Sequence, residues 1–348
     1  MANRITGVDI GSTTIRAVEV ENPGRPNPSL IRHASIPIPR GAVARGEVVE
    51  PNTVAACLRQ LWTTHRFSSK KVVLGVGNQR VLVRDLSVAA APRQQIREAL
   101  PFNVQDMLPV PVSEALLDFY PIGPNPANPG EVQGLLVAAV KEAVLGTVRA
   151  VESAGLNTTE VDLIPFALSR ALAPAQSGTS ANVLIEVGAT ATTVVVERSG
   201  IPQFVRIIPA GGDDLTRALG SELNLEEPQA EELKRGLGLA RSVDSPDQQR
   251  AVEIIYRVTG ELLTSIRNTI TFFANTRPDQ PIGRVVLTGG GTQLPGFPEA
   301  LGEMTRLEVV PGDPLGKFTL TRKLSASRLA AERSELTIAL GLVLGSAA

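Results

Sequence analysis

The chain has 348 residues, of which 43% are hydrophobic, 20% are charged and only 3% are aromatic, so its length predicts two domains or more with cores of Val, Ile, Leu and Ala. Its 34 basic and 35 acidic residues leave a net charge of -1, which argues against a surface for nucleic acid or for an anionic membrane. One cysteine excludes an internal disulfide, and two histidines argue against a zinc site or a Ser-His-Asp triad.

The first predicted elements are two strands joined by a turn rich in hydroxyl groups, in the stretch VDIGSTTIRAVEV at residues 8–20. Asp9 lies in the first strand, and Gly11, Ser12 and Thr13 belong to the turn. A plain hairpin needs neither the acid nor the hydroxyls. A phosphate-binding hairpin uses both, because phosphates bind to amides and hydroxyls and their metal ion is held by carboxylates.

A helix around Trp62 and a buried strand, KKVVLGVGN, follow the hairpin, and the pattern then changes at residue 80. The strand VLVRDLSV, a helical segment interrupted by Pro101, a hairpin and a helix that ends at Gly155 come in succession. Residues 80–157 therefore predict a small α+β insertion.

The opening pattern returns in ANVLIEVGATATTVVVERSG, which begins at residue 181. Alignment of the two stretches on their glycines pairs Asp9 with Glu186, Gly11 with Gly188 and Thr13 with Thr190. A repeat of this kind, within alternating strands and helices, predicts two similar α/β halves that face each other.

The second half continues with helices predicted at 226–240 and 253–276, a strand that runs into three glycines, and a closing apolar helix, SELTIALGLVLG. A run of glycines lets a flat base approach the backbone closely. Glu231 and Lys234 lie on one helical face, either as an exposed ion pair or as part of a binding site. Asp213 and Asp214 fit the start of a helix, and the chain has neither a P-loop nor a G-x-G-x-x-G motif.

This ordered set resembles the ATPase core shared by actin, hexokinase and the heat-shock chaperones. VDIGSTTIR and VLIEVGATATT resemble its two phosphate loops, and VDLIPFALSRAL and TIALGLVLG its two connecting helices. RIIPAGGDDLT resembles a γ-phosphate turn, EELKR a ribose-binding helix and VVLTGGGTQLPGF an adenosine motif. The resemblance spans nearly the whole chain. It implies an α/β, actin-like (ribonuclease H-like) two-domain fold with ATP or ADP and Mg2+ in the cleft between the halves.

Within that superfamily, the insertion at 80–157 is similar to the extra subdomain of the PilM family of type IV pilus assembly proteins. It is more distantly similar to the corresponding subdomain of the division protein FtsA. The resemblance implies a first half made of 1–79 and 158–180 and joined by the closing helix 335–348, with a second half at 181–334.

The same resemblance implies a scaffold that binds the cytoplasmic N-terminal tail of a PilN-like bitopic membrane protein and that can self-associate. The start of the chain has no signal-peptide pattern, and no apolar run approaches the roughly 18 residues of a membrane span. We therefore expect a cytoplasmic protein that reaches the inner membrane through its partner, without direct membrane insertion and without nucleic acid.

Carried over to this sequence, the resemblance implies a nucleotide site of Gly11, Ser12, Thr13, Arg16, Gly188, Thr190, Gly211, Gly212, Glu231, Lys234, Gly289, Gly290 and Gly291. Asp9 and Glu186 would hold Mg2+ through water. Asp162, expected on the first connecting helix, and Glu186 are the catalytic candidates. Arg16 stands where many relatives have lysine, Glu186 where aspartate is usual, and Ala189 where actin has a second acid. We therefore expect slow hydrolysis at most, with nucleotide acting as a conformational ligand.

Two alternatives stay open on the residues alone, an FtsA-like division protein and a sugar or acyl kinase of the same superfamily. FtsA typically ends in a basic amphipathic helix, whereas this chain ends in SELTIALGLVLGSAA, without a basic face. A kinase needs a base for the hydroxyl of its substrate, and no aspartate in a sugar-binding context is recognisable here.

Overall fold

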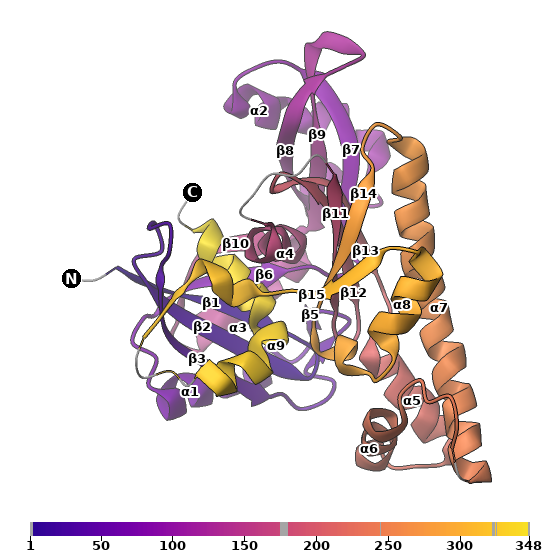
Figure 1. The fold of residues 1–348 in the computed structure, drawn as a ribbon. Coiled ribbons are helices and arrows are strands. Elements are labelled where there is room, and N and C mark those ends of the chain that lie inside the picture. Colours follow the sequence, from indigo (N-terminus) through magenta and orange to yellow (C-terminus); the bar gives the residue numbers. More distant parts are fainter. Residues whose placement is uncertain (1–2, 175–179, 244, 322–323, 325, 347–348) are drawn as a thin grey trace.

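The computed structural model describes residues 3–174, 180–243, 245–321, 324 and 326–346. Two α/β halves lie side by side, and a third part projects from the first half at the top of Figure 1. Residues 175–179 and 347–348, which close two of the predicted domain segments, lie outside the described residues.

The first half is built on a six-stranded sheet with the order β10-β6-β1-β2-β3-β16. Its strands are β1 (Arg4–Ile10), β2 (Thr14–Glu21), β3 (Ser29–Pro37), β6 (Lys71–Val76), β10 (Asn157–Leu163) and β16 (Thr319–Leu320). β1, β2 and β3 are antiparallel, and β6 runs parallel to β1. The predicted hairpin is confirmed, because Ile10 pairs with Ile15 across a turn at 11–14.

Both faces of this sheet are covered, since its β-branched residues alternate between two cores. Val8 points into a core formed with α1 (Pro51–His65) and α3 (Lys141–Ser153). Ile5 points into the opposite core, which contains α4 (Ile164–Leu172) and α9 (Ala326–Gly345). The short strands β4 (Val43–Ala44) and β5 (Glu47–Val48) pair with each other.

The second half repeats this topology with the strand order β13-β12-β11-β14-β15. Its strands are β11 (Ala181–Val187), β12 (Thr192–Arg198), β13 (Ile201–Ile208), β14 (Ile282–Thr288) and β15 (Glu308–Pro311). β11, β12 and β13 form an antiparallel meander, and β14 lies parallel to β11 as β6 lies parallel to β1. The predicted repeat of two similar halves is therefore confirmed.

The helices of the second half lie on the side of its sheet that faces away from the first half. α7 (Pro246–Thr276) and α8 (Phe297–Thr305) cover that face of the sheet, while α5 (Gly212–Leu223) and α6 (Glu227–Leu237) pack on α7 in a smaller cluster. The opposite face packs on α4, so α4 and α9 lie between the two sheets, at the centre of Figure 1. These are the two connecting helices that the sequence predicted, although α9 begins at Ala326 and not at residue 335.

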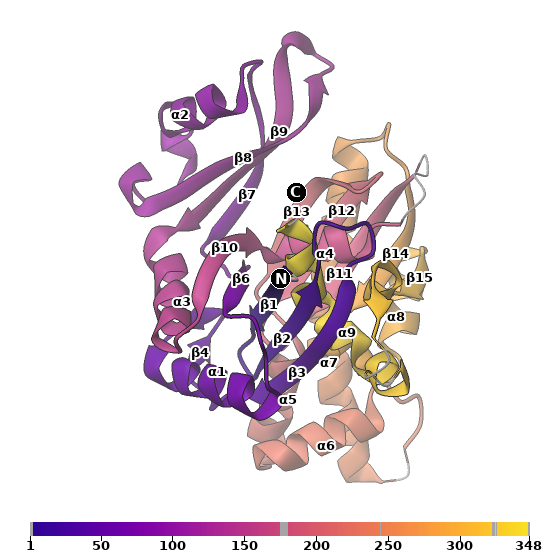
Figure 2. The same ribbon diagram turned by 90° about the vertical axis from the view of Figure 1, so that its left-hand side faces the viewer.

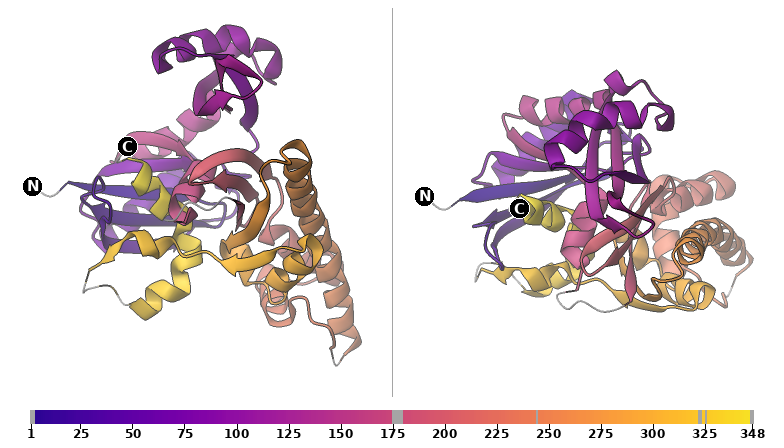
Figure 3. Two further views of the ribbon diagram at one scale, coloured as in Figure 1. Left: turned by 45° about the horizontal axis from the view of Figure 1, so that its top comes forward. Right: turned by 90° about the horizontal axis from the view of Figure 1, so that it is seen from above.

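The projecting part is a three-stranded antiparallel sheet with the order β7-β9-β8 and a helix on one face (Figure 2). It contains β7 (Val81–Ala89), α2 (Arg93–Asn103), β8 (Ala115–Asn125) and β9 (Asn128–Val140). Seen from above in Figure 3, it lies over the first half and reaches toward β13. The predicted α+β insertion is thus present, with single turns at Gln105–Met107 and Val112–Glu114.

Two of the predicted domain boundaries are wrong. The insertion ends near Val140, because Ala150 and Val151 of α3 pack with Leu58 of α1 in the core of the first half. The second half does not extend to residue 334, because β16 pairs with β3 in the first sheet. Among the described residues, no helix has the combination of length and apolar composition that crossing a bilayer requires.

Candidate functional site

A cleft of about 1150 Å³ lies between the two halves. Its walls are the turns at 11–14 and 188–191, the start of α5, one side of α6 and the glycine run after β14. Every residue predicted to bind nucleotide or to hold metal lines this cleft, whereas Asp162 does not. The residues predicted from both halves therefore line one contiguous cleft.

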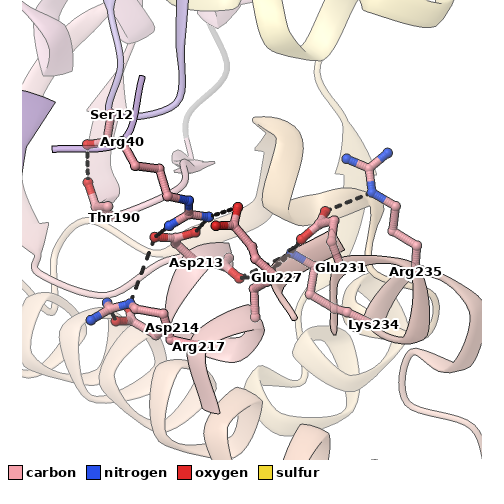
Figure 4. Close-up of polar contacts among 12 residues, drawn as sticks. Ser12, Arg40, Thr190, Asp213, Asp214, Arg217, Glu227, Glu231, Lys234 and Arg235 are labelled. Atoms are coloured by element: carbon pink, nitrogen blue, oxygen red, sulfur yellow. Dashed lines mark hydrogen bonds and ion pairs between the residues drawn. The ribbon is translucent and has the colours of Figure 1, made fainter. Parts of the chain in front are cut away.

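The two hairpin turns have the same geometry and meet across the cleft. The Gly11 amide donates to the Thr14 carbonyl at 3.1 Å, and the Gly188 amide donates to the Ala191 carbonyl at 2.9 Å. The Ser12 Oγ lies 2.8 Å from the Thr190 Oγ1, as Figure 4 shows. Two hydroxyls predicted to line the nucleotide site, one from each half, therefore contact each other, although the alignment of the repeats pairs Thr190 with Thr13.

Four backbone amides in these turns make no hydrogen bond to the described part of the chain, namely those of Ser12, Thr13, Ala189 and Thr190. Backbone amides that converge on one point, with hydroxyls beside them, form a typical anion site. The two turns thus offer donors from opposite sides to one anionic ligand.

Gly211 and Gly212 hold α5 against the second turn. The Gly212 amide donates to the Gly188 carbonyl at 2.9 Å, and the Asp213 amide donates to the Ala189 carbonyl at 2.8 Å. A Cβ at position 211 would lie 2.5 Å from the Gly188 oxygen, so only glycine permits this approach. The amide of Gly211 donates to the Asp214 carboxylate at 2.8 Å, which makes Gly211 a packing residue in this structure.

Asp9 and Glu186 occupy equivalent strand positions at the bottom of the cleft. Burial and the nearby Asp9 carboxylate raise the pKa of Glu186 to about 8, although Arg16 opposes the shift. Burial also raises the pKa of Asp9, again against the effect of Arg16. Two buried acids with raised pKa values suit a cation, and among the described residues no cluster of three or more metal-ligating side chains occurs. A hydrated Mg2+ held by only two carboxylates fits this donor set.

Arg16 is held by Glu335, which also lines the cleft. Its guanidinium donates to the Glu335 carboxylate of α9 at 2.6 Å, and 18% of its side chain is exposed. Arg16 thereby ties the first hairpin to the second connecting helix while its charge partly offsets the two buried acids.

Glu231 and Lys234 line the cleft wall, where they form an ion pair with each other. Lys234 Nζ donates to Thr216 Oγ1 at 2.8 Å and to the Gly212 carbonyl at 3.2 Å, and 14% of its side chain is exposed. Burial alone would raise the pKa of Glu231, but hydrogen bonds from Lys234, Arg235 and Thr216 together lower it to about 2. This carboxylate is therefore an ionised acceptor at neutral pH.

The three glycines after β14 have two different roles. Gly289 has a φ of +94° and approaches Val187 so closely that a Cβ would lie 2.5 Å from the Val187 oxygen. A Cβ on Gly291 would meet the Val187 side chain at 2.5 Å. A Cβ on Gly290 would have no neighbour within 4 Å, so the open face of the run belongs to Gly290.

The prediction that Asp162 lies on the connecting helix is wrong. Asp162 belongs to β10, its carboxylate accepts hydrogen bonds from Arg170 and from the Leu163 amide, and burial raises its pKa. The helix α4 begins only after this strand, at Ile164 with Pro165 in its first turn, which explains the error. The geometry gives no support to a role for Asp162 in orienting water in the cleft.

The sequence did not reveal that Arg40 also lines the cleft. Arg40 follows β3 in the first half and forms ion pairs with Asp213 of α5 and Glu227 of α6 in the second half (Figure 4). No local pattern in the chain could indicate a contact between residues that lie so far apart in the sequence.

Comparison of the sequence with known families gives a match over residues 7–347 to the family described as type IV pilus assembly protein PilM. The cell division protein FtsA of Bacillus subtilis (strain 168) is 24% identical over 300 residues, which cover 74% of this chain and 68% of FtsA. FtsA of Enterococcus hirae is 28% identical over 195 residues, and the matched segment spans 44% of its length. The expected distant similarity to FtsA is thereby confirmed.

Among solved structures, the chain is similar to that of a PilM-PilN type IV pilus biogenesis complex, with a TM-score of 0.86 and 29% identity over 99% of this chain and 98% of the other. MreB 5 of Spiroplasma citri bound to AMPPNP has a TM-score of 0.54 with 11% identity, covers 97% of this chain and 94% of its own, and supports the fold alone. The actin-like two-domain fold expected from the motifs is confirmed. The chain belongs to the PilM family of type IV pilus assembly proteins.

Proposed function

We propose that this chain is a cytoplasmic scaffold of type IV pilus assembly that binds ATP in its cleft and a PilN-like tail through its insertion. One observation supports ATP binding most directly: two equivalent turns, one from each half of the chain, converge in the cleft. Their Ser12 Oγ and Thr190 Oγ1 atoms lie 2.8 Å apart. Free amides and hydroxyls from opposite sides suit a chain of phosphates. A ligand held in this way stabilises one relative position of the two halves.

The remaining cleft residues fit the other parts of a nucleotide. Glu231 is an ionised acceptor beside Lys234, which suits the hydroxyls of a ribose. The open face of Gly290 suits a flat base. Asp9 and Glu186 would hold Mg2+ through water, and the ion when bound would neutralise phosphate charge and the two acids together.

We infer that this chain hydrolyses ATP slowly or not at all. Burial and the Asp9 carboxylate raise the pKa of Glu186 to about 8, so without a bound metal ion this carboxyl is largely protonated at neutral pH. Asp162 is bound to Arg170 and lies outside the cleft wall, and position 189 is an alanine. Because neither Asp162 nor position 189 supplies a second acid to orient water, nucleotide would act mainly by shifting the balance between conformations.

The proposed partner is the cytoplasmic N-terminal tail of a PilN-like bitopic membrane protein. Support comes from the family and from the similar structure, which was solved as a PilM-PilN complex. We infer that the insertion binds this tail, because it projects from the two halves and its sheet has two edge strands, β7 and β8. Unpaired strand edges can bind an extended peptide through its backbone.

Titration of the full chain with a fluorescent synthetic peptide of such a tail tests this function by fluorescence anisotropy. We expect binding at micromolar concentration or better. Excision of residues 81–139 should abolish it, and a short linker can close the gap because the Val140 amide donates to the Arg80 carbonyl at 3.1 Å. Retained binding of a fluorescent ATP analogue would show that the excised protein is folded. No binding to the full chain would contradict the proposed partner, and binding to the excised protein would contradict the proposed receptor.

A further inference from the structure

Three charged residues join the two halves at the rim of the cleft, and we call this group the Arg40 clasp. Arg40 Nη1 and Nη2 donate to the two carboxylate oxygens of Asp213 at 3.0 and 2.9 Å, and Arg40 also forms an ion pair with Glu227. The side chains of Arg40 and Glu227 are 43% and 51% exposed, whereas Asp213 is 12% exposed. The clasp therefore spans from the solvent-facing edge of the cleft to its wall.

Each side of the clasp is fixed to one of the two turns. On the first half, the Ile38 amide donates to the Thr13 carbonyl at 3.0 Å, two residues before Arg40. On the second half, the Asp213 amide donates to the Ala189 carbonyl at 2.8 Å. A change in the distance between the turns is thus transmitted to the clasp through single hydrogen bonds on each side.

The geometry of the pair distinguishes it from an ordinary surface ion pair. Arg40 binds Asp213 through two parallel hydrogen bonds, and such bidentate pairs are stronger and more directional than single contacts. Asp213 also lies 3.8 Å from Arg217, so its carboxylate is held in place on α5. Because the partners belong to different halves, the pair can form only when the halves are close.

We propose that the Arg40 clasp is a gate of the cleft, which must open for nucleotide to enter or leave and which therefore sets the exchange rate. This inference rests on the proposed nucleotide site and assigns its regulation. The clasp contributes little to the affinity for nucleotide, since it lies at the rim of the cleft and must open both for association and for release. Any partner that separates Arg40 from Asp213 would accelerate exchange.

The test compares Arg40→Gln with the matched control Arg4→Gln in the full-length chain. Arg4 is 39% exposed and pairs with Glu21 at 2.9 Å, but both residues belong to the first half and neither lines the cleft. Association and release of a fluorescent ATP analogue are followed by stopped-flow fluorescence, and thermal unfolding checks the fold. We expect Arg40→Gln to accelerate both steps about fivefold, which corresponds to about 1 kcal/mol, with Kd nearly unchanged. Arg4→Gln should match the wild type, and Arg40→Lys should be intermediate because it keeps only the charge.

A second measurement needs no nucleotide, namely hydrogen exchange in the free proteins of the amides of Ile38, Gly212 and Asp213, which donate to carbonyls of the two turns. Faster exchange in Arg40→Gln than in Arg4→Gln would support the gate. Unchanged exchange, unchanged release, or slower association with unchanged release would overturn it, the last because Arg40 would then be a ligand contact. If the wild type binds no nucleotide, the proposed nucleotide site is wrong. Hydrogen exchange alone then tests whether the Arg40 clasp holds the two halves together.

Discussion

The Ser12 Oγ lies 2.8 Å from the Thr190 Oγ1, although 178 positions separate the two residues in the chain. Each residue occupies the turn of its own hairpin, and each hairpin starts the main sheet of one half. The contact therefore joins the two copies of the internal repeat at one site. A ligand that bridges the two turns would also bridge the two halves.

A double-mutant cycle should detect this contact. We expect Ser12→Ala and Thr190→Ala to be coupled by about 0.5–1.5 kcal/mol in the free energy of unfolding, because one hydrogen bond is lost in either variant. Urea denaturation of the four proteins measures the coupling. Thr305→Ala is a control for Thr190→Ala, since the Thr305 hydroxyl bonds within α8, and it should be additive with Ser12→Ala. Additivity between Ser12→Ala and Thr190→Ala would contradict the contact.

Gly290→Asp should abolish nucleotide binding without unfolding the protein. The position has open space around its Cβ, so the new side chain causes no clash, but its negative charge faces the bound nucleotide. Gly290→Asn has nearly the same size without the charge and should bind several-fold more tightly than Gly290→Asp. Titration with a fluorescent ATP analogue compares the two, and equal affinity of both variants with the wild type would exclude Gly290 from the site.

The ion-paired Glu231 should contribute stability that depends on pH. Its pKa is lowered from 4.5 to about 2 in the folded chain, so the stabilisation is complete above about pH 4.5 and is lost as the pH falls toward about 2. The difference in unfolding free energy between the wild type and Glu231→Gln should therefore shrink between about pH 5 and about pH 3. Because Glu231 is 33% exposed, we expect a change of at most about 1 kcal/mol. A difference that stays constant over this range, measured by urea denaturation, would contradict the assignment.

The crossing of α4 and α9 should tolerate no side chain at position 341. A Cβ on Gly341 would lie 2.0 Å from the Ala167 oxygen, so Gly341→Ala must push the two connecting helices apart. We expect a loss of about 1–3 kcal/mol in the free energy of unfolding. Gly260→Ala, in the middle of α7 with no neighbour within 4 Å, should instead stabilise by about 0.5–1 kcal/mol. Changes of the same sign in both variants would contradict the packing described here.

The sequence predicted the repeat because it depends on local patterns, whereas the residues of the site came from the resemblance to the ATPase core. VDIGSTTIR and IEVGATATT each carry alternating apolar residues around a glycine, and that pattern alone defines a hairpin with an acid in its first strand. The glycine run and the i, i+3 pair of Glu231 and Lys234 are equally local. Their order along the chain resembles that of the ATPase core, and this resemblance implied which elements face one cleft.

The errors concern features that depend on the tertiary structure. The amphipathic pattern of α3 does not say that Ala150 and Val151 pack on α1 of the first half, nor does Thr319-Leu320 reveal that it pairs with β3. Asp162 was placed on a helix because an apolar run cannot distinguish the end of β10 from the start of α4. Arg40 was missed because its partners come from the other half of the chain.

The most direct test of this account is a crystal structure of the full chain grown with ATP, Mg2+ and the PilN-like tail peptide. We predict phosphates between Ser12-Thr13 and Ala189-Thr190, the ribose against Glu231 and the peptide on the insertion at 81–140. Nucleotide bound outside the cleft, or a cleft without nucleotide at saturating ATP, would contradict the central claim that the two turns form one phosphate site.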